Sequence, residues 1–467
     1  MEFVADLHLH SKYSRAVSPQ MMLPEMAKWA AKKGINLLTT GDWTHPLWLR
    51  SIKRELEEAG EGVYKIKTPA FAKASAGKQN SKVEDVRLIL TTEIASIFKQ
   101  REKLRRIHNL IFAPSIETAE KINKELLGRS CNLSSDGRPI IGLSSKNLLE
   151  MLLNIDKKII LIPCHAWTPH FGIYGSASGF DSIKESFEDL SNYIYGVETG
   201  ISSDPWMNWQ IKELKNRSIL SFSDAHSLPK MGRETTVFNI EKSLDTLTYT
   251  DIGKAIISQM KMEDKKWMRE NSARVAYTIE FYPEEGKYHY TGHRNCKVIK
   301  SPQQIKESGN TCPVCSRKLT EGVMYRVQQL AGQAEFKIYN SELDENGVNW
   351  IKDPRNIHPP FVKLVPLNEI VAESISSPVG SEKVKIKFDE LCLEFGSEIN
   401  ILLKTPIQGL LKAAGEKIAE GVAKVRQGDI FIEPGFDGEY GKVKIWGEKP
   451  AVEISSGIQE DQLGLKF

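Results

Sequence analysis

Short apolar runs that end abruptly at polar residues recur through the first half of the chain. The run that begins at Phe3 ends at the pair His8 and His10, and a later run ends at Asp224 and His226. Alternate residues of a β-strand point to the same side, so each pair presents two side chains together. A lone histidine is more often a packed or surface residue, but two such pairs can close around a metal ion.

Four further apolar runs predict strands that end at a carboxylate or an imidazole. The runs and their terminal residues are 35–40 with Asp42, 86–92 with Glu93, 159–163 with His165, and 193–197 with Glu198. Catalytic residues of a β/α barrel gather at the C-terminal ends of its parallel strands. Asp, Glu and His without Cys suit Zn, Mn, Mg or Fe. The pattern therefore predicts an α/β barrel with a polynuclear hydrolytic centre, where bound water loses its proton near neutral pH.

The length and composition of the chain predict a multidomain protein. A chain of 467 residues exceeds one compact core and predicts two or three domains. The formal charge is only +3, so any nucleic-acid surface must be a local patch. The sequence has no secretory leader and no apolar run of membrane-spanning length, so we expect a cytoplasmic protein without a membrane partner. No Gly-x4-Gly-Lys-Ser/Thr loop occurs, which excludes an ATP-driven helicase.

The second half of the chain contains a clear metal-binding pattern. His293 and Cys296 form one knuckle, and Cys312 and Cys315 form another after fifteen intervening residues. One histidine and three cysteines in two tight knuckles meet the needs of a tetrahedral structural zinc. Six unevenly spaced cysteines argue against a disulfide framework. His289 is an alternative to His293 as the fourth ligand.

Two stretches near the predicted centre are candidates for DNA contact. Residues 99–106 hold five cations against one acid, and we expect Lys99, Arg105 and Arg106 to contact phosphates. The alternative is a solvated helix face. Trp206 and Trp209 would ordinarily pack, although aromatic residues beside a barrel mouth can also stack on an extruded base.

The last residues of the chain form a short recognition motif. Gln462, Leu463, Leu465 and Phe467 match the bacterial sliding-clamp pattern Gln-x-x-Leu-x-Phe. In such a peptide the Gln amide fixes orientation while the apolar side chains fill a cleft. Upstream, residues 413–422 predict two short helices joined by a glycine, either a plain αα-hairpin or a minimal helix-hairpin-helix.

The proposed ligands together resemble the polymerase and histidinol phosphatase (PHP) phosphoesterase superfamily. The resemblance implies one ion held by His8, His10, Glu93 and Asp224, a second held by Glu93, His108 and His165, and a third that uses Asp42 and His226. The family often has His or Asp where this chain has Ser14-Arg15. Arg15 cannot bind a cation but can hold a phosphate. The block Gly-Asp-Trp-Thr-His leaves Asp42 and His45 as alternatives.

Over nearly its whole length, except 67–84 and the tail, the chain resembles endonuclease Q. Blocks such as DLHLHS, TTGDWTHP, RRIH, SDAHS, GHRNC and EPGFDGEYG carry the resemblance. It implies a repair nuclease that nicks DNA on the 5′ side of a deaminated base (hypoxanthine, uracil or xanthine) or of an abasic site. Asp224, His226, His8 and His10 would lie at its catalytic centre, with zinc in the barrel or with Mg or Mn for catalysis.

The resulting domain prediction has five parts. They are a distorted (β/α)7 PHP barrel at 1–245, a helical connector at 246–285, a zinc module at 286–335, an α+β DNA-binding region at 336–450 and a flexible tail at 451–467. Two other functions stay open. One is a PHP phosphatase acting on a small phosphomonoester, and the other is a non-catalytic DNA-repair adaptor.

Overall fold

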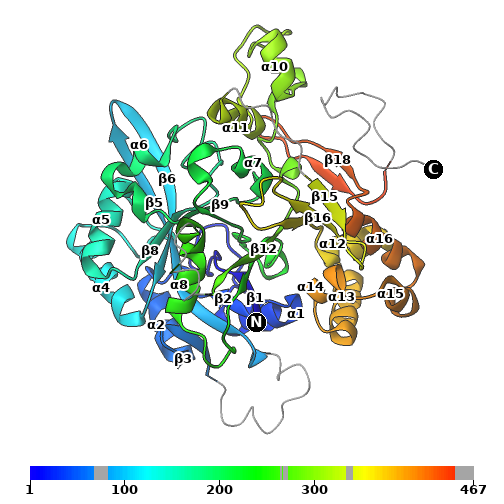
Figure 1. Cartoon of the computed structure of the whole chain (residues 1–467), viewed down its shortest axis with the longest axis horizontal. Helices are drawn as coiled ribbons and strands as arrows, with labels where there is room; N and C mark the ends of the chain where they lie inside the picture. Colours follow the sequence, from blue (N-terminus) through cyan, green and yellow to red (C-terminus); the bar gives the residue numbers. More distant parts are fainter. Residues whose placement is uncertain (68–82, 263–265, 267–271, 333–339, 448–467) are drawn as a thin grey trace.

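The computed structural model describes residues 1–67, 83–262, 266, 272–332 and 340–447. These residues form a mixed α/β structure, as the sequence predicts. A small module projects at the top of Figure 1, and a group of helices lies on the right-hand side. Among the described residues no helix is both long enough and apolar enough to span a bilayer.

The largest sheet is built around β1 (Glu2–Asp6). β1 pairs in parallel with β2 (Leu37–Thr39), and β2 pairs in parallel with β5 (Arg87–Gln100). On its other side β1 is antiparallel to β11 (Thr235–Asn239). All three residues of β2 are buried, which is typical of a strand covered on both faces.

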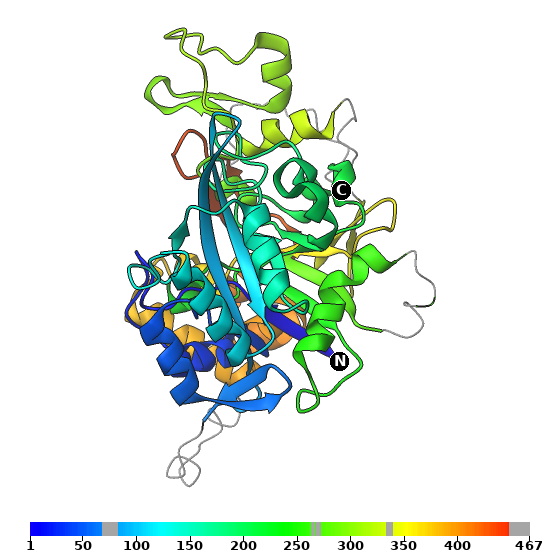
Figure 2. The same ribbon diagram turned by 90° about the vertical axis from the view of Figure 1, so that its left-hand side faces the viewer.

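The strands of the predicted barrel do not all run in parallel. β5 forms a long antiparallel hairpin with β6 (Lys103–Ala113), and β8 (Ile160–Pro163) is antiparallel to β6. The reversal occurs at Arg101 and Glu102, which both have positive φ. A two-residue turn of this kind joins antiparallel strands directly, whereas a parallel pair needs a long crossover. The long blade of β5 and β6 is visible in Figure 2.

The remaining described elements of this part are three further strands of the main sheet, a separate strand pair, and helices. β9 (Gly196–Glu198) and β10 (Ser218–Leu220) form a separate parallel pair. The other elements are α1 (Leu23–Lys33), α2 (Pro46–Glu55), β3 (Leu56–Gly60), β4 (Val63–Ile66), α4 (Ile116–Gly128), β7 (Ile140–Ile141), α5 (Ser145–Ile155), α6 (Ile183–Phe187), α7 (Pro205–Trp209) and α8 (Tyr249–Ile257). α1 starts beside Pro24 and ends at Gly34 with φ of 89°, as the helix signals predict.

The segment 246–285, expected to be helical, contains α8 and also a strand. β12 (Arg274–Glu280) is antiparallel to β11 and parallel to β17 (Phe361–Lys363). β15 (Asn340–Leu343) and β16 (Asn349–Lys352) extend the same sheet. The main sheet therefore joins strands from three of the predicted domains, because its hydrogen bonds are completed by strands distant in sequence.

The zinc-module sequence forms the projection at the top of Figure 1. Its elements are β13 (Thr291–His293), β14 (Val298–Lys300), α10 (Pro302–Ser308) and α11 (Val323–Ala331). β13 and β14 are antiparallel and are joined across Cys296. The hairpin holds the first knuckle at its turn.

The C-terminal helices pack around a second hydrophobic core, to which Ile279 of β12 and Val362 of β17 also contribute. These helices are α12 (Leu367–Ser374), α13 (Glu382–Phe395), α14 (Glu398–Leu403), α15 (Ile407–Ala414) and α16 (Glu416–Gln427), followed by β18 (Phe431–Glu433) and β19 (Lys442–Lys444). They dock on α1, where Trp29 stacks on Phe388 and the buried Lys33 forms an ion pair of 2.5 Å with Glu398. α15 and α16 form the hairpin that the sequence predicts.

Candidate metal centre

Three segments bring four potential ligands to one point, with Glu93 on β5. Leu9 pairs with Ala225 in an isolated parallel bridge, and this register places His8 and His10 beside Asp224. His10 Nε2 lies 3.2 Å from Glu93 Oε2 and 3.1 Å from Asp224 Oδ1. His8 Nε2 lies 3.7 Å from each of the same two oxygens. The predicted first ligand set is therefore assembled.

These atoms fit a cation better than they fit one another. His8 Nε2, His10 Nε2 and Asp224 Oδ1 are buried and have no hydrogen-bond partner among the described residues. Buried polar atoms without partners are costly, and a divalent ion would satisfy all three. Asp224 also has a positive φ, as do Asp42 and His165. Such backbone conformations in non-glycine residues cluster at functional sites.

A second set lies on the other oxygen of Glu93. His108 on β6 pairs with Ala95 in the ladder, which places it on the same face as Glu93 and diagonally across the strands. Glu93 Oε1 lies 2.5 Å from His108 Nδ1 and 3.0 Å from His165 Nε2. The two oxygens of Glu93 thus face different sets, which is the arrangement of a carboxylate shared by two ions.

Two predicted ligands instead support the imidazoles. Glu198 Oε1 and Oε2 lie 3.0 and 3.1 Å from His8 Nδ1, and Asp42 Oδ1 lies 3.0 Å from His10 Nδ1. The second oxygen of Asp42 accepts bonds from the Ser11 backbone N–H, the Ser11 hydroxyl and the Ser14 hydroxyl. Carboxylates in this position fix the tautomer of a histidine whose other nitrogen binds a metal. The structure therefore places Asp42 and Glu198 behind the ligands.

The third predicted set is only partly assembled. His226 groups with His10 and Asp224, and the rings of His10 and His226 are 4.9 Å apart. Asp42 does not complete this set, because its two carboxylate oxygens face His10 Nδ1 and Ser11. His45, the alternative to Asp42, stacks on Tyr13 and donates from Nε2 to the Ser134 carbonyl.

Charge in the centre follows from these contacts. Burial raises the pKa of Glu93, but His108 and Arg138 outweigh it and hold that pKa well below its usual range. Burial likewise opposes ionisation of Asp224, yet its two histidine neighbours lower its pKa. Burial lowers the pKa of His108 to about 4, so its imidazole is neutral near pH 7 and can ligate.

Sequence reasoning missed two residues of this centre. Arg138 donates from one terminal guanidinium nitrogen to Glu93 Oε2 at 3.0 Å. It comes from an irregular loop with no periodicity, so no sequence signal marked it. Cys164 lies with its Sγ 3.6 Å from Glu93 Oε1. Burial raises the pKa of this thiol well above its usual range, and a protonated thiol is a poor ligand.

The predicted DNA contacts lie on the β5–β6 hairpin. Arg105 is buried, with its guanidinium 4.0 Å from the Phe180 ring centre and a hydrogen bond to the Gly179 carbonyl. Arg106 lies on the opposite strand face. Lys99 is exposed near the hairpin tip, six residues or roughly 20 Å beyond Glu93. The basic run is therefore not a helix face. The register places Lys99 and Arg106 on the strand face of Glu93 and Arg105 on the opposite face, so DNA contact by Lys99 and Arg106 stays a prediction.

The remaining predicted residues lie away from the ligand sets or outside the described residues. Trp209 is buried, stacks on His358 and packs against Phe361, which matches the packing alternative. Arg15 is exposed and lies beside Asp136. The clamp motif lies outside the described residues, as do residues 68–82 of the insertion.

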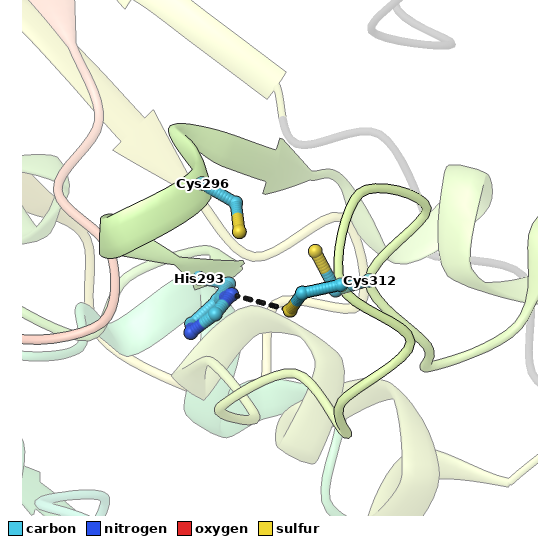
Figure 3. Close-up of side chains that lie close together, drawn as sticks. His293, Cys296 and Cys312 are labelled. Carbon is cyan, nitrogen blue, oxygen red and sulfur yellow. Dashed lines mark hydrogen bonds between the residues drawn. The ribbon is translucent and has the colours of Figure 1, made fainter.

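The cysteine knuckles meet in the projecting module. His293, Cys296, Cys312 and Cys315 offer ligand atoms that all lie within 4.8 Å of one another. Figure 3 shows how His293, Cys296 and Cys312 approach each other. Cys315 Sγ lies 3.3 Å from His293 Nδ1. His289 is buried elsewhere and is not in this group, so the geometry favours His293 as the fourth ligand.

Comparison with known proteins agrees with this architecture. The family model of the MJ0043 C-terminal domain matches residues 366–429. The chain is 29% identical to the uncharacterized protein MJ0043 of Methanocaldococcus jannaschii over 61% of this chain and 32% of that protein, so it spans about a third of this relative. It is 28% identical to the uncharacterized protein YqxK of Bacillus subtilis over 72% of this chain and 74% of that protein.

Solved structures match the chain over its full length. The lesion-specific endonuclease PfuEndoQ from Pyrococcus furiosus has a TM-score of 0.76 and 28% identity, with 100% of both chains covered. Endonuclease Q in complex with a 27-mer duplex carrying an abasic lesion at the active site has a TM-score of 0.74 and 28% identity, with 96% of this chain and 99% of that chain covered. The resemblance to endonuclease Q that the sequence blocks indicate is thereby confirmed.

Proposed function

We propose that this chain is a DNA repair endonuclease that hydrolyses a phosphodiester beside a damaged nucleotide. The observation that carries the proposal is the convergence of His8, His10 and Asp224 on one oxygen of Glu93 and of two further histidines on the other. The full-length similarity to a lesion-specific endonuclease supports DNA as the substrate. A small-molecule phosphatase would need only the metal centre, whereas this similarity extends over every part of the chain.

The residues divide into ligands and supports. His8, His10, Glu93 and Asp224 would hold one divalent cation, and Glu93, His108 and His165 a second. Bound there, such cations would supply Lewis acidity. They would also lower the pKa of a bound water molecule to near neutral pH. Glu198 and Asp42 accept the Nδ1 protons of His8 and His10, which keeps each Nε2 lone pair free to bind.

The other parts of the chain would hold and select the DNA. We propose a structural zinc at His293, Cys296, Cys312 and Cys315, which fills all four positions and leaves none for chemistry. We also propose that the substrate carries a deaminated base or an abasic site and is cut on the 5′ side. A mispaired base leaves the stack more cheaply than a paired one. The C-terminal motif Gln462, Leu463, Leu465 and Phe467 would bind a sliding clamp.

A nicking assay tests the proposal directly. Purified protein is incubated with end-labelled duplexes that contain uracil, hypoxanthine, an abasic site or no lesion, with Mg, Mn or Zn. We expect one nick 5′ to the lesion, and we expect Asp224→Ala to abolish it while duplex binding persists. Asp245→Ala, which changes an exposed carboxylate, is the matched control. Turnover of a free phosphomonoester without nicking would support a phosphatase instead, and binding without any turnover would support an adaptor.

A further inference from the structure

One arginine reaches the centre from a loop that carries no ligand. Arg138 lies between α4 and β7, and its side chain is 28% exposed. It makes a single hydrogen bond from its guanidinium to the described residues, 3.0 Å to Glu93 Oε2. A guanidinium has five N–H donors in a fixed fork, so most of its donors remain available at the open side of the centre.

The loop around Arg138 is firmly attached to the first histidine motif. Asp136 Oδ1 accepts the backbone N–H of Arg138 at 3.1 Å and that of Arg15 at 3.3 Å, and Asp136 Oδ2 lies 3.5 Å from Arg15 Nε. A Cβ on Gly137 would lie 2.3 Å from Ser14 Oγ and 2.4 Å from Asp42 Oδ2. Only a residue without a side chain allows this approach. Asp136 therefore links two arginines at the rim of one site.

Formal charge indicates what such a site would bind. Glu93 and Asp224 are the anionic ligands, and two divalent cations together with Arg138 exceed their charge even after Asp42 and Glu198 are counted. The remaining positive charge favours binding of an anion. Arginine forks bind planar or tetrahedral oxyanions through paired hydrogen bonds, and phosphate is the main anion of DNA.

We propose that Arg138, with Arg15 on its outer side, forms an anion subsite that binds the non-bridging oxygens of the phosphodiester to be cleaved. This inference rests on the proposed function and adds a residue to it. The competing explanation is that Arg138 only neutralises Glu93 and helps to assemble the metal ligands. The two explanations differ in what happens to metal content and to phosphate affinity.

The experiment compares Arg138→Gln and Arg138→Lys with wild type and with the matched control Arg129→Gln. Arg129 is exposed and forms an ion pair with Glu125 in the same connection, away from the centre. Metal content is measured by mass spectrometry, binding of inorganic phosphate to the metal-loaded full chain by calorimetry, and kcat and KM with an abasic duplex.

We expect Arg138→Gln to retain wild-type metal content, to bind inorganic phosphate at least ~10-fold more weakly and to lose ~10²–10³ in kcat. Arg138→Lys keeps the charge without the fork and should fall between wild type and Arg138→Gln; it also replaces that variant if the latter does not fold. Lost metal in both variants, unchanged phosphate affinity, or a wild type that binds no phosphate would each overturn the proposal. A wild type that binds phosphate through Arg138 but nicks no lesion duplex would refute only the proposed function.

Discussion

The replacement Asp42→Asn tests whether Asp42 acts through His10 or as a ligand. In the native structure Asp42 Oδ1 accepts from His10 Nδ1 at 3.0 Å, while Oδ2 accepts three bonds, including the Ser11 backbone N–H at 2.6 Å. Asn has one oxygen and one NH₂ group in place of the two oxygens. It can therefore accept a hydrogen bond either from His10 Nδ1 or from the Ser11 backbone N–H, but not from both.

Both orientations of the substituted amide carry a cost. If its oxygen faces Ser11, its NH₂ group faces His10 Nδ1, and the imidazole must accept there and place its proton on Nε2, which then cannot bind a cation. If its oxygen faces His10, the Ser11 backbone N–H is buried without an acceptor, at about 1–3 kcal/mol. Loss of such a supporting partner typically lowers metal affinity ~10–100-fold, or about 1.4–2.7 kcal/mol.

The assay is competition for the divalent ion against a coloured chelator, with wild type and Asp189→Asn measured in parallel. Asp189 is an exposed carboxylate in an ion pair with Lys146 and serves as the control. We expect Asp42→Asn to lose affinity for one ion and the control to behave as wild type. An unchanged affinity would show that the tautomer of His10 does not depend on Asp42, and complete loss of one bound ion would indicate that Asp42 is a direct ligand.

Three further predictions concern the rest of the chain. Cys312→Ser should remove about one zinc per chain and lower the yield of folded protein; retention of that zinc in the metal analysis would show that the knuckles do not hold it. Arg105→Met should lower the free energy of unfolding by roughly 2 kcal/mol, through loss of its contacts with Phe180 and the Gly179 carbonyl, with duplex affinity unchanged; weaker binding by stably folded protein would restore Arg105 as a DNA contact. Burial raises the pKa of Glu280 to about 8 from 4.5, so the folded state binds a proton that the unfolded chain releases, and stability falls as pH rises between these values. Glu280→Gln should reduce that fall by up to about 1.4 kcal/mol per pH unit in urea titrations, and parallel curves for variant and wild type would contradict this.

The approach of the candidate ligands to one another was predictable because their signal is local. In an apolar run that ends at His-x-His or Asp-x-His, the two polar side chains point to the same side of the strand. The structure brings His8, His10 and Asp224 together as expected. The bridging role of Glu93 was implied by resemblance and agrees with the geometry. A carboxylate at a strand end gives the same pattern whether it faces a cation or an imidazole, so the positions of Asp42 and Glu198 behind the ligands could not be read from sequence.

Other features depend on long-range packing and gave no sequence signal. Arg105 and Arg106 are adjacent cations, yet strand alternation buries one of them against Phe180. The sequence predicts a strand at 86–92 but none over β6, because β6 begins within the basic run. Arg138 reaches Glu93 only because the loop around Gly137 packs on the first motif.

The docking of the C-terminal helices on α1 limits how the chain can be divided into fragments. Truncation before residue 366 would remove Phe388 and Glu398 and would thereby expose Trp29 and the Lys33 ammonium, which pack against them in the whole chain. Truncation near residue 245 would also remove the strands that complete the main sheet beside β11. A minimal fragment that ends after the last metal ligand is therefore not expected to be an independently folded nuclease.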